Sequence, residues 1–267
     1  MFRIAFLATT IATVLVASAI STVGQAQSSG WGWGTLTGQF VYDGPVPAVR
    51  YLPTSGLDVE FLWSIPHVVD ERLIVDPDSR GIKNVVVFAR KVSRIHPSYE
   101  APDARSRTME IRDCVFRPHV LVTDVTQAIT LRNADPIVHT GTILLRLEPS
   151  INILLGPGGE IHHSFWRHTD VPIAVKCHLC PWTRAYVWPR ENPYFAVTDE
   201  NGRFEIPNLP AHEEIEFQVW HEDSWEPLGR LPAKPQWEDG RFRATVPDGG
   251  IRDLGTIEVA PSAFRTK

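Results

Sequence analysis

Three observations predict an all-β protein built of β-sandwiches. Short runs of β-branched and aromatic residues recur along the chain, Gly and Pro turns separate them, and no convincing helical periodicity follows the first 26 residues. Many short strands with frequent turn signals are typical of sandwiches. The chain has 267 residues, of which 43% are hydrophobic, so we expect a sizeable core.

The first 26 residues have the layout of a secretory signal peptide. Arg3 precedes an apolar stretch from Ile4 to Ile20, and Gly24-Gln25-Ala26 is a small-residue cleavage site. The apolar stretch is short for a membrane span and is diluted by threonine and serine. We therefore expect a periplasmic or secreted protein with no transmembrane span after signal cleavage.

Charge and motifs exclude several functional classes. The formal net charge is −5 and basic residues do not cluster, which argues against a nucleic-acid partner. The sequence has no nucleophile-elbow serine, no His-Glu-x-x-His motif and no Gly-rich phosphate loop. We therefore expect that the protein is not an enzyme.

Strands are expected between turn signals along the first two thirds of the mature chain. A Gly-rich lead-in, residues 27–33, precedes them. Turns are expected at Asp43-Gly44-Pro45, Asp76 to Gly81, Asn133 to Pro136 and Gly156 to Glu160. The strands expected in order are Thr35 to Tyr42, Leu73 to Val75, Val85 to Ala89, Val115 to Val122, Ala128 to Leu131, Thr140 to Leu147, Ile161 to Phe165, Val171 to Val175 and Ala185 to Val187.

The last third has the best hairpin signal in the chain. Phe195 to Thr198 and Arg203 to Ile206 flank Asp199-Glu200-Asn201-Gly202, and Asn-Gly supplies the positive φ angles of a tight turn. The acidic run lacks the later ligand of a calcium loop, so it predicts a turn only. Further strands are expected at Glu214 to Trp220, Arg241 to Val246 and Gly255 to Val259.

The loop between two apolar runs, Val171 to Val175 and Ala185 to Val187, concentrates residues that bind metals. It reads Cys177-His178-Leu179-Cys180-Pro181-Trp182 and contains two of the three cysteines. His139 follows the turn at Asn133 to Pro136. A histidine at one strand end and a cysteine in a distant loop are how a β-sandwich assembles copper ligands.

Two segments resemble the ligand segments of exported cupredoxin-like proteins, the plastocyanin-like group often called methylamine utilisation proteins. They are Asn133 to His139, which fits the family pattern Asn-x-Asp-x-x-x-His, and Val175 to Val187, which is similar to Cys-x-x-His-Pro-Trp-Met. The resemblance implies a Greek-key cupredoxin-like sandwich at 34–190, copper binding or electron transfer, and a redox partner protein. The tail, 191–260, resembles a carboxypeptidase regulatory-like (transthyretin-like) β-sandwich.

The departures from the family pattern lie among the ligands that the resemblance implies. His139 and Cys177 stand at the positions of the first histidine and of the cysteine ligand. Cys180 replaces the second histidine, and Thr183 replaces the axial methionine. Blue-copper electron transfer therefore does not carry over directly.

Three hypotheses for Cys177 and Cys180 remain open at this point. In the first, His139, Cys177 and Cys180, with His119 or His178 added, bind copper or zinc, since thiolates favour Cu(I) and Zn. In the second, Cys177 forms a structural disulfide with Cys180 or Cys114, and the protein is a metal-free structural or cell-surface interaction module. In the third, the Cys-x-x-Cys pair is redox-active, which usually requires a helix N-terminus.

The remaining histidines have structural interpretations. His162, His163 and His168 lie near one another in sequence, but adjacent strand residues face opposite sides of a sheet and do not readily share an ion. His221 is expected to form a structural hydrogen bond.

Overall fold

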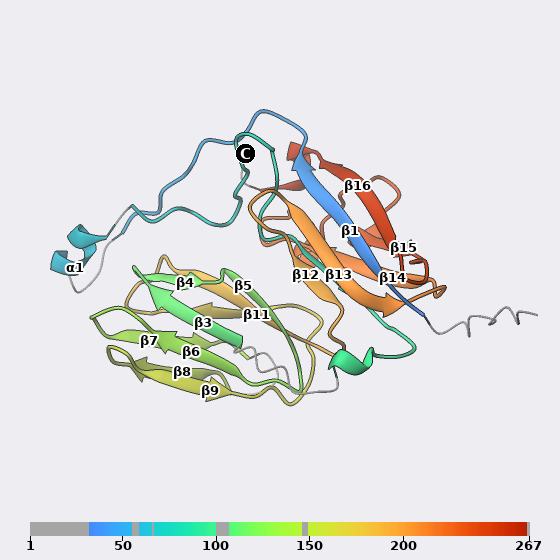
Figure 1. Ribbon diagram of the computed structural model, residues 1–267. Coiled ribbons are helices and arrows are strands. Elements are labelled where there is room, and N and C mark those ends of the chain that lie inside the picture. The colour runs from blue at the N-terminus through green and yellow to red at the C-terminus, as the bar shows by residue number, and fades with distance from the viewer. Residues whose placement is uncertain (1–31, 55–58, 66, 100–106, 146–148, 266–267) are drawn as a thin grey trace, which may run out of the picture.

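The computed structural model describes residues 32–54, 59–65, 67–99, 107–145 and 149–265, and the all-β prediction is confirmed over these ranges. The predicted signal peptide and most of the lead-in lie outside the described residues. One short α-helix, α1 (Val59–Ser64), lies in the long excursion between the first two strands (Figure 1). Among the described residues, no helix has the length and apolarity needed to span a membrane.

Two sheets from the middle of the chain form one sandwich, which we call the site sandwich. Its five-stranded sheet has the order β5-β11-β10-β7-β8, and its four-stranded sheet has the order β4-β3-β6-β9. The strands are β3 (Arg107–Arg112), β4 (Val115–Arg117), β5 (Val120–Asp124), β6 (Ile129–Asn133), β7 (His139–Ile143), β8 (Ile151–Leu155), β9 (Glu160–His163), β10 (Ile173–Lys176) and β11 (Arg184–Arg190).

Alternating side chains from these sheets form the core of the site sandwich. In β10, Ile173 and Val175 are buried while Ala174 and Lys176 are partly exposed, as expected for a strand with one face on the core. The same core contains Ile111 and Leu131 of the facing sheet and all three cysteines. The cysteine loop therefore begins where a core strand ends.

A second sandwich combines strands from both ends of the chain. Its sheets have the orders β13-β1-β16 and β12-β2-β14-β15. The strands are β1 (Trp33–Tyr42), β2 (Val86–Ala89), β12 (Phe195–Val197), β13 (Arg203–Pro210), β14 (Ile215–Trp220), β15 (Arg241–Ala244) and β16 (Ile251–Val259). Figure 1 shows this sandwich above the site sandwich.

β1 and β2 lie within the unit expected at 34–190, but they pair with strands of the C-terminal tail. β1 pairs with β13 and, in parallel, with β16, and β2 pairs with β12 and β14. β1 largely alternates apolar with polar residues, and β2 is uniformly apolar. Each of these local patterns fits either sandwich. The choice of partner depends on contacts far apart in the chain, which local periodicity does not encode.

The turn at Asp199 to Gly202 forms, but the expected hairpin does not. Gly202 has a φ of +73°, and its N–H donates to the carbonyl of Asp199. Beyond the turn, β12 pairs with β2 while β13 pairs with β1, so the two strands enter different sheets. A turn signal specifies local backbone geometry and not the later course of its strands.

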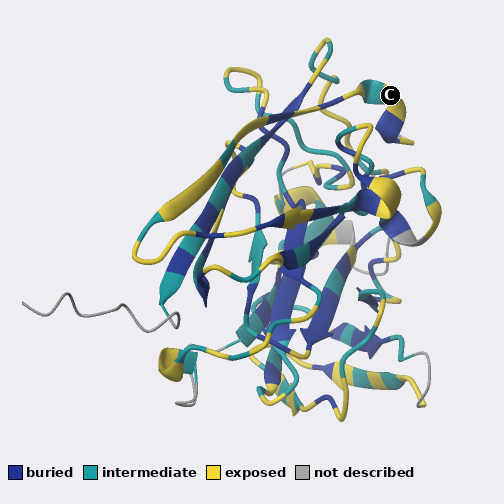
Figure 2. Ribbon diagram, turned by 90° about the vertical axis from the view of Figure 1, so that its right-hand side faces the viewer, coloured by how far each residue is buried: buried dark blue, intermediate teal, exposed yellow. Residues whose placement is uncertain are grey.

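The two sandwiches contact through an apolar cluster, which we call the junction cluster. It consists of Val86, Phe88, Val120, Val122, Trp188 and Trp220, all buried. These residues come from both sandwiches, and Figure 2 shows buried strands continuing through the middle of the molecule.

Candidate metal centre

Four buried side chains from four places in the site sandwich meet at one end of its core. His139 is the first residue of β7, and Cys114 lies in the turn between β3 and β4. Cys177 directly follows β10, and Cys180 lies in the loop that leads to β11. All four side chains are buried, and the three cysteines are free thiols in the structure.

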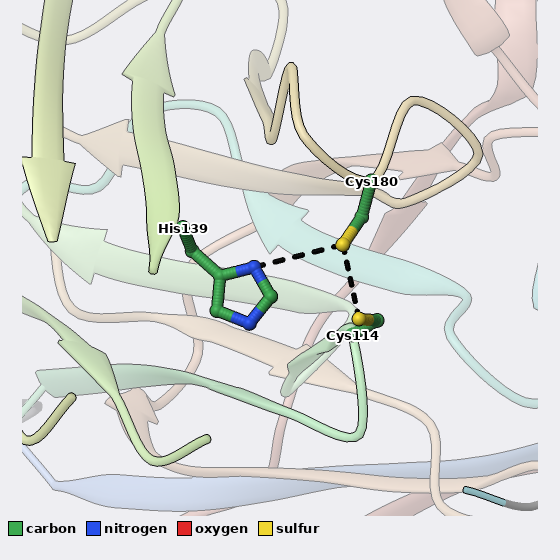
Figure 3. Close-up of side chains that lie close together, drawn as sticks. All are labelled: Cys114, His139 and Cys180. Atoms are coloured by element: carbon green, nitrogen blue, oxygen red, sulfur yellow. Dashed lines mark hydrogen bonds between the residues drawn. The ribbon is translucent and has the colours of Figure 1, made fainter. Parts of the chain in front are cut away.

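The imidazole of His139 lies close to the sulfur atoms. Its Nδ1 atom is 3.6 Å from Cys177 Sγ and 3.6 Å from Cys180 Sγ. Cys180 Sγ is 3.0 Å from Cys114 Sγ, and the ligand atoms of Cys114, His139 and Cys180 all lie within 4.8 Å of one another. Figure 3 shows these three side chains pointing toward one another.

The spacing fits a shared metal ion in part. A nitrogen and a sulfur that bind one tetrahedral ion at usual bond lengths lie about 3.5 Å apart, and two such sulfurs lie about 3.8 Å apart. The two N···S distances of 3.6 Å match this value. The S···S distance of 3.0 Å is shorter, so Cys114 and Cys180 must separate by somewhat under ~1 Å to share an ion.

Asp135 holds the opposite side of the imidazole. Its Oδ2 atom lies 2.8 Å from His139 Nε2, so Nε2 donates its proton there and Nδ1 is left facing the sulfurs. The carboxylate also accepts the N–H groups of Asp113 and Cys114. A carboxylate on the far nitrogen is the usual way in which a metal-binding histidine is oriented.

The turn that carries Cys114 depends on the same carboxylate. Asp113 and Cys114 both have positive φ angles, 54° and 58°, a conformation that is uncommon for residues other than glycine. Their two N–H groups converge on Asp135, which stabilises this turn. One buried carboxylate therefore positions both Cys114 and His139.

Asn133 fixes the loop that carries Asp135. It is fully buried, and its Oδ1 accepts the N–H of Asp135. Its Nδ2 lies within hydrogen-bond distance of the carbonyls of Ile137, Leu155 and Gly156. The Asn-x-Asp spacing in the sequence thus serves to hold the loop before His139.

The environment separates the protonation states of the cysteines. A hydrogen bond from the Cys180 thiol, together with His139 and Thr140, overcomes the effect of burial and lowers the pKa of Cys177 to about 3. Hydrogen bonds with Cys114 and Cys177, together with burial, raise the pKa of Cys180. Burial alone lowers the pKa of His139, but Asp135 and Cys177 outweigh it and raise that pKa to about 9. Without a metal, Cys177 is therefore a thiolate beside an imidazolium.

The structure brings together three of the five predicted site residues. His139, Cys177 and Cys180 converge, whereas His178 is exposed, and only its backbone N–H contacts the group, through Thr140 Oγ1 at 2.6 Å. His119 lies elsewhere, against Glu222 and Glu71. Cys114 was expected only as a disulfide partner, and the odd number of cysteines is the signal in the sequence that one more thiol needed a role.

The other histidines behave largely as expected. His162 is exposed and lies 3.6 Å from Glu160, and His168 is partly exposed and lies 2.8 Å from Glu191. His221 is buried, lies 3.3 Å from the carbonyl of Lys83 and accepts the N–H of Asp223. Burial lowers the pKa of His221 to about 4, so it is neutral and structural, as expected.

The arrangement defines a class of site: one imidazole and up to three thiols, buried at the end of a β-sandwich. No protein-family model matches the chain, and no curated protein matches it. Several solved structures do match, and those described below are cupredoxins or contain copper.

Three of these structures illustrate the likeness. A copper-containing nitrite reductase from Thermus scotoductus SA-01 is 16% identical, with a TM-score of 0.32 over 38% of this chain and 28% of that chain. A purple cupredoxin from Nitrosopumilus maritimus is 19% identical, with a TM-score of 0.28 over 32% and 99%. The Cu(I) form of an amicyanin mutant is 14% identical, with a TM-score of 0.30 over 39% and 98%. At these scores the likeness carries no information about ligands.

Proposed function

We propose that this protein is an exported copper-binding protein of the cupredoxin class, with an altered ligand set. The observation that supports this proposal is the convergence of His139 Nδ1 and the buried sulfurs of Cys177, Cys180 and Cys114. His139, Cys177 and Cys180 would hold the ion, with Cys114 beside them. Export, to the periplasm or beyond the cell, is the prediction from the first 26 residues.

The donor set favours Cu(I). Soft thiolates stabilise Cu(I), and Cys180 and Thr183 replace the imidazole and thioether of a blue-copper site. Copper would supply a soft, redox-active centre, while the chain's own residues hold it: Asp135 orients His139, and Thr140 donates hydrogen bonds to Cys177. We therefore propose that the main function is to bind Cu(I). Electron transfer to a partner protein stays a prediction, as does zinc binding at the same donors.

A second candidate is a metal-free module closed by a Cys114–Cys180 disulfide. The specific observation in its favour is the 3.0 Å distance between the two sulfurs. Exported proteins meet oxidising conditions in which such a pair readily forms a bond. The disulfide would remove Cys114 and Cys180 as donors. An ion would then find only His139 and Cys177.

Copper binding and thiol counting together distinguish the two. The mature chain is purified, its thiols are counted under denaturing conditions before and after reduction, and Cu(I) binding is measured by competition with a chromophoric chelator. We expect three thiols and one Cu(I) per chain, with affinity reduced at least roughly tenfold in Cys177→Ser and in His139→Gln. His162→Gln, at an exposed histidine outside the group, is the matched control. One thiol before reduction, and no Cu(I) bound after it, would establish the disulfide module instead.

A further inference from the structure

A second group of donors surrounds a pocket beside the cysteine loop, apart from the four-residue site. The pocket has a volume of about 260 Å³ and is lined by residues of both sandwiches and of the segment that connects β1 with β2. Among its lining residues are His119, Glu71, Glu222, Lys176, Trp182 and Arg184. None of these belongs to the cysteine group.

His119 is fixed in orientation by its Nε2 atom. The side chain is 6% exposed, and Nε2 lies 2.6 Å from Glu222 Oε2. The other oxygen of Glu222 accepts the hydroxyl of Tyr186 at 2.9 Å. This chain of hydrogen bonds commits Nε2 as a donor and turns Nδ1 toward Glu71.

Nδ1 of His119 lies in a different situation. It is buried and makes no well-aligned hydrogen bond among the described residues, and Glu71 Oε2 lies 3.4 Å away as an ion-pair partner of the protonated ring. Burial lowers the pKa of His119, but Glu222 and Glu71 outweigh it and raise that pKa to about 9, so an ion at Nδ1 would displace a proton. An imidazole and a carboxylate in direct hydrogen bonding approach to about 2.7–2.9 Å, as on the Glu222 side. Two ligands that bind one tetrahedral ion at about 2.1 Å lie about 3.4 Å apart. The Glu71 side therefore has the spacing of a pair that shares an ion.

We propose that His119 Nδ1 and Glu71 bind a divalent transition-metal ion at a second site, distinct from the cysteine group. An imidazole nitrogen and a carboxylate oxygen suit Cu²⁺ and Zn²⁺, with Cu²⁺ bound more tightly. Glu222 and Tyr186 position His119 through its other nitrogen, as carboxylates do at known histidine-metal sites. His119 and Glu71 are the two protein ligands identified among the described residues. The other coordination positions of the ion would be open to the pocket.

Charged and polar groups line the rest of the pocket. Arg72 is paired with Asp70, and Arg184 lies 3.8 Å from Glu222. Lys176 has no ion pair among the described residues, and the buried indole nitrogen of Trp182 has no hydrogen-bond partner there. Both donors line the same pocket as His119 and Glu71.

Zinc titration of the mature, reduced chain tests the proposal. Zn²⁺ is used for stoichiometry because it does not oxidise thiols, and binding is measured by calorimetry in the wild type and in Glu71→Gln, His119→Gln and Cys177→Ser. We expect Glu71→Gln and His119→Gln each to abolish the binding of one equivalent of Zn²⁺, or to weaken its affinity roughly 100-fold. Binding of the other equivalent, which Cys177→Ser abolishes, should be unchanged in both variants. His162→Gln is the matched control, because His162 also lies near a glutamate, at 3.6 Å, but is exposed.

The outcomes separate the two sites. Glu71 is partly exposed and Gln has nearly the same shape, so Glu71→Gln decides the question even if His119→Gln folds poorly. Equal Zn²⁺ stoichiometry and affinity in wild type and Glu71→Gln would overturn the proposal, whatever happens at the cysteines. Electron paramagnetic resonance of Cu²⁺ bound to a variant with His139→Gln and Cys177→Ser, which lacks the imidazole and one thiol of the other site, gives a second readout. Nitrogen coupling that is lost when His119→Gln is added supports the assignment, and unchanged coupling contradicts it.

Discussion

Asp135 connects more of the candidate site than any other side chain described in the structure. It accepts a hydrogen bond from Nε2 of His139, and it accepts the two N–H groups of the turn at Asp113 and Cys114, where both residues have positive φ angles. These bonds lower the pKa of Asp135 although burial alone would raise it. A single carboxylate thus couples the geometry of a nitrogen donor to that of a sulfur donor.

Asp135→Asn should therefore reduce both stability and metal affinity. The amide keeps one acceptor but directs a donor at N–H groups, so we expect a loss of about 2–4 kcal/mol in the free energy of unfolding, measured by urea titration. Loss of the carboxylate should also lower the pKa of His139, measured by NMR. Asp253→Asn is the control, because Asp253 makes similar bonds to Thr37 and Gly255 at an exposed position. Equal stability of the Asp135 and Asp253 variants would contradict this role.

At the scale of the element, the loop from Cys177 to Thr183 supplies two donors of the proposed copper site and would determine which copper chemistry it supports. It starts at the end of β10 and returns in β11, and the two strands are paired directly from Lys176 and Arg184 inward. Its ends are therefore held rigidly, while Cys180 and Thr183 are both buried. The N–H of Thr183 donates to the carbonyl of Cys180, which closes the loop.

The double substitution Cys180→His with Thr183→Met should convert this loop to a blue-copper ligand set. It supplies a second imidazole and a thioether next to His139 and Cys177, so Cu²⁺ should give an intense thiolate-to-copper band in the visible spectrum. Thr183→Met alone, which keeps Cys180, should give no such band. Circular dichroism checks that the larger side chains are accommodated. A folded double variant without the band would mean that the scaffold does not hold the ligands in place.

At the scale of the whole molecule, the junction cluster joins the two sandwiches. Trp188 of β11 and Trp220 of β14 have ring centroids 5.7 Å apart, and Trp188 also meets Phe88 of β2 at 4.8 Å. Arg190 lies over the Phe88 ring, 3.9 Å from its centroid. Large aromatic contacts of this kind supply much of the energy of an interface between packed units.

Trp220→Ala should uncouple the sandwiches. We expect a loss of about 3–5 kcal/mol and, in calorimetry, the replacement of one unfolding transition by two, because the substitution leaves a cavity in the junction cluster and removes the contact of Trp220 with Trp188. Trp166→Ala is the control, since Trp166 is 89% exposed and its loss should change stability by about 0.5 kcal/mol or less. A single transition at unchanged temperature in Trp220→Ala would show that other contacts join the two units.

The sequence by itself determined the all-β class, most strand positions and two segments of the site, because strand periodicity, turn residues and the Asn-x-Asp-x-x-x-His and Cys-x-x-Cys spacings are local. Only the tertiary structure decided that β1 and β2 join the C-terminal strands, that Cys114 meets Cys180, and that His119 faces Glu71 instead of the cysteines. These outcomes depend on pairing and packing between residues far apart in the chain. No local pattern encodes such contacts, since the same alternating strand can pair with any partner of matching register.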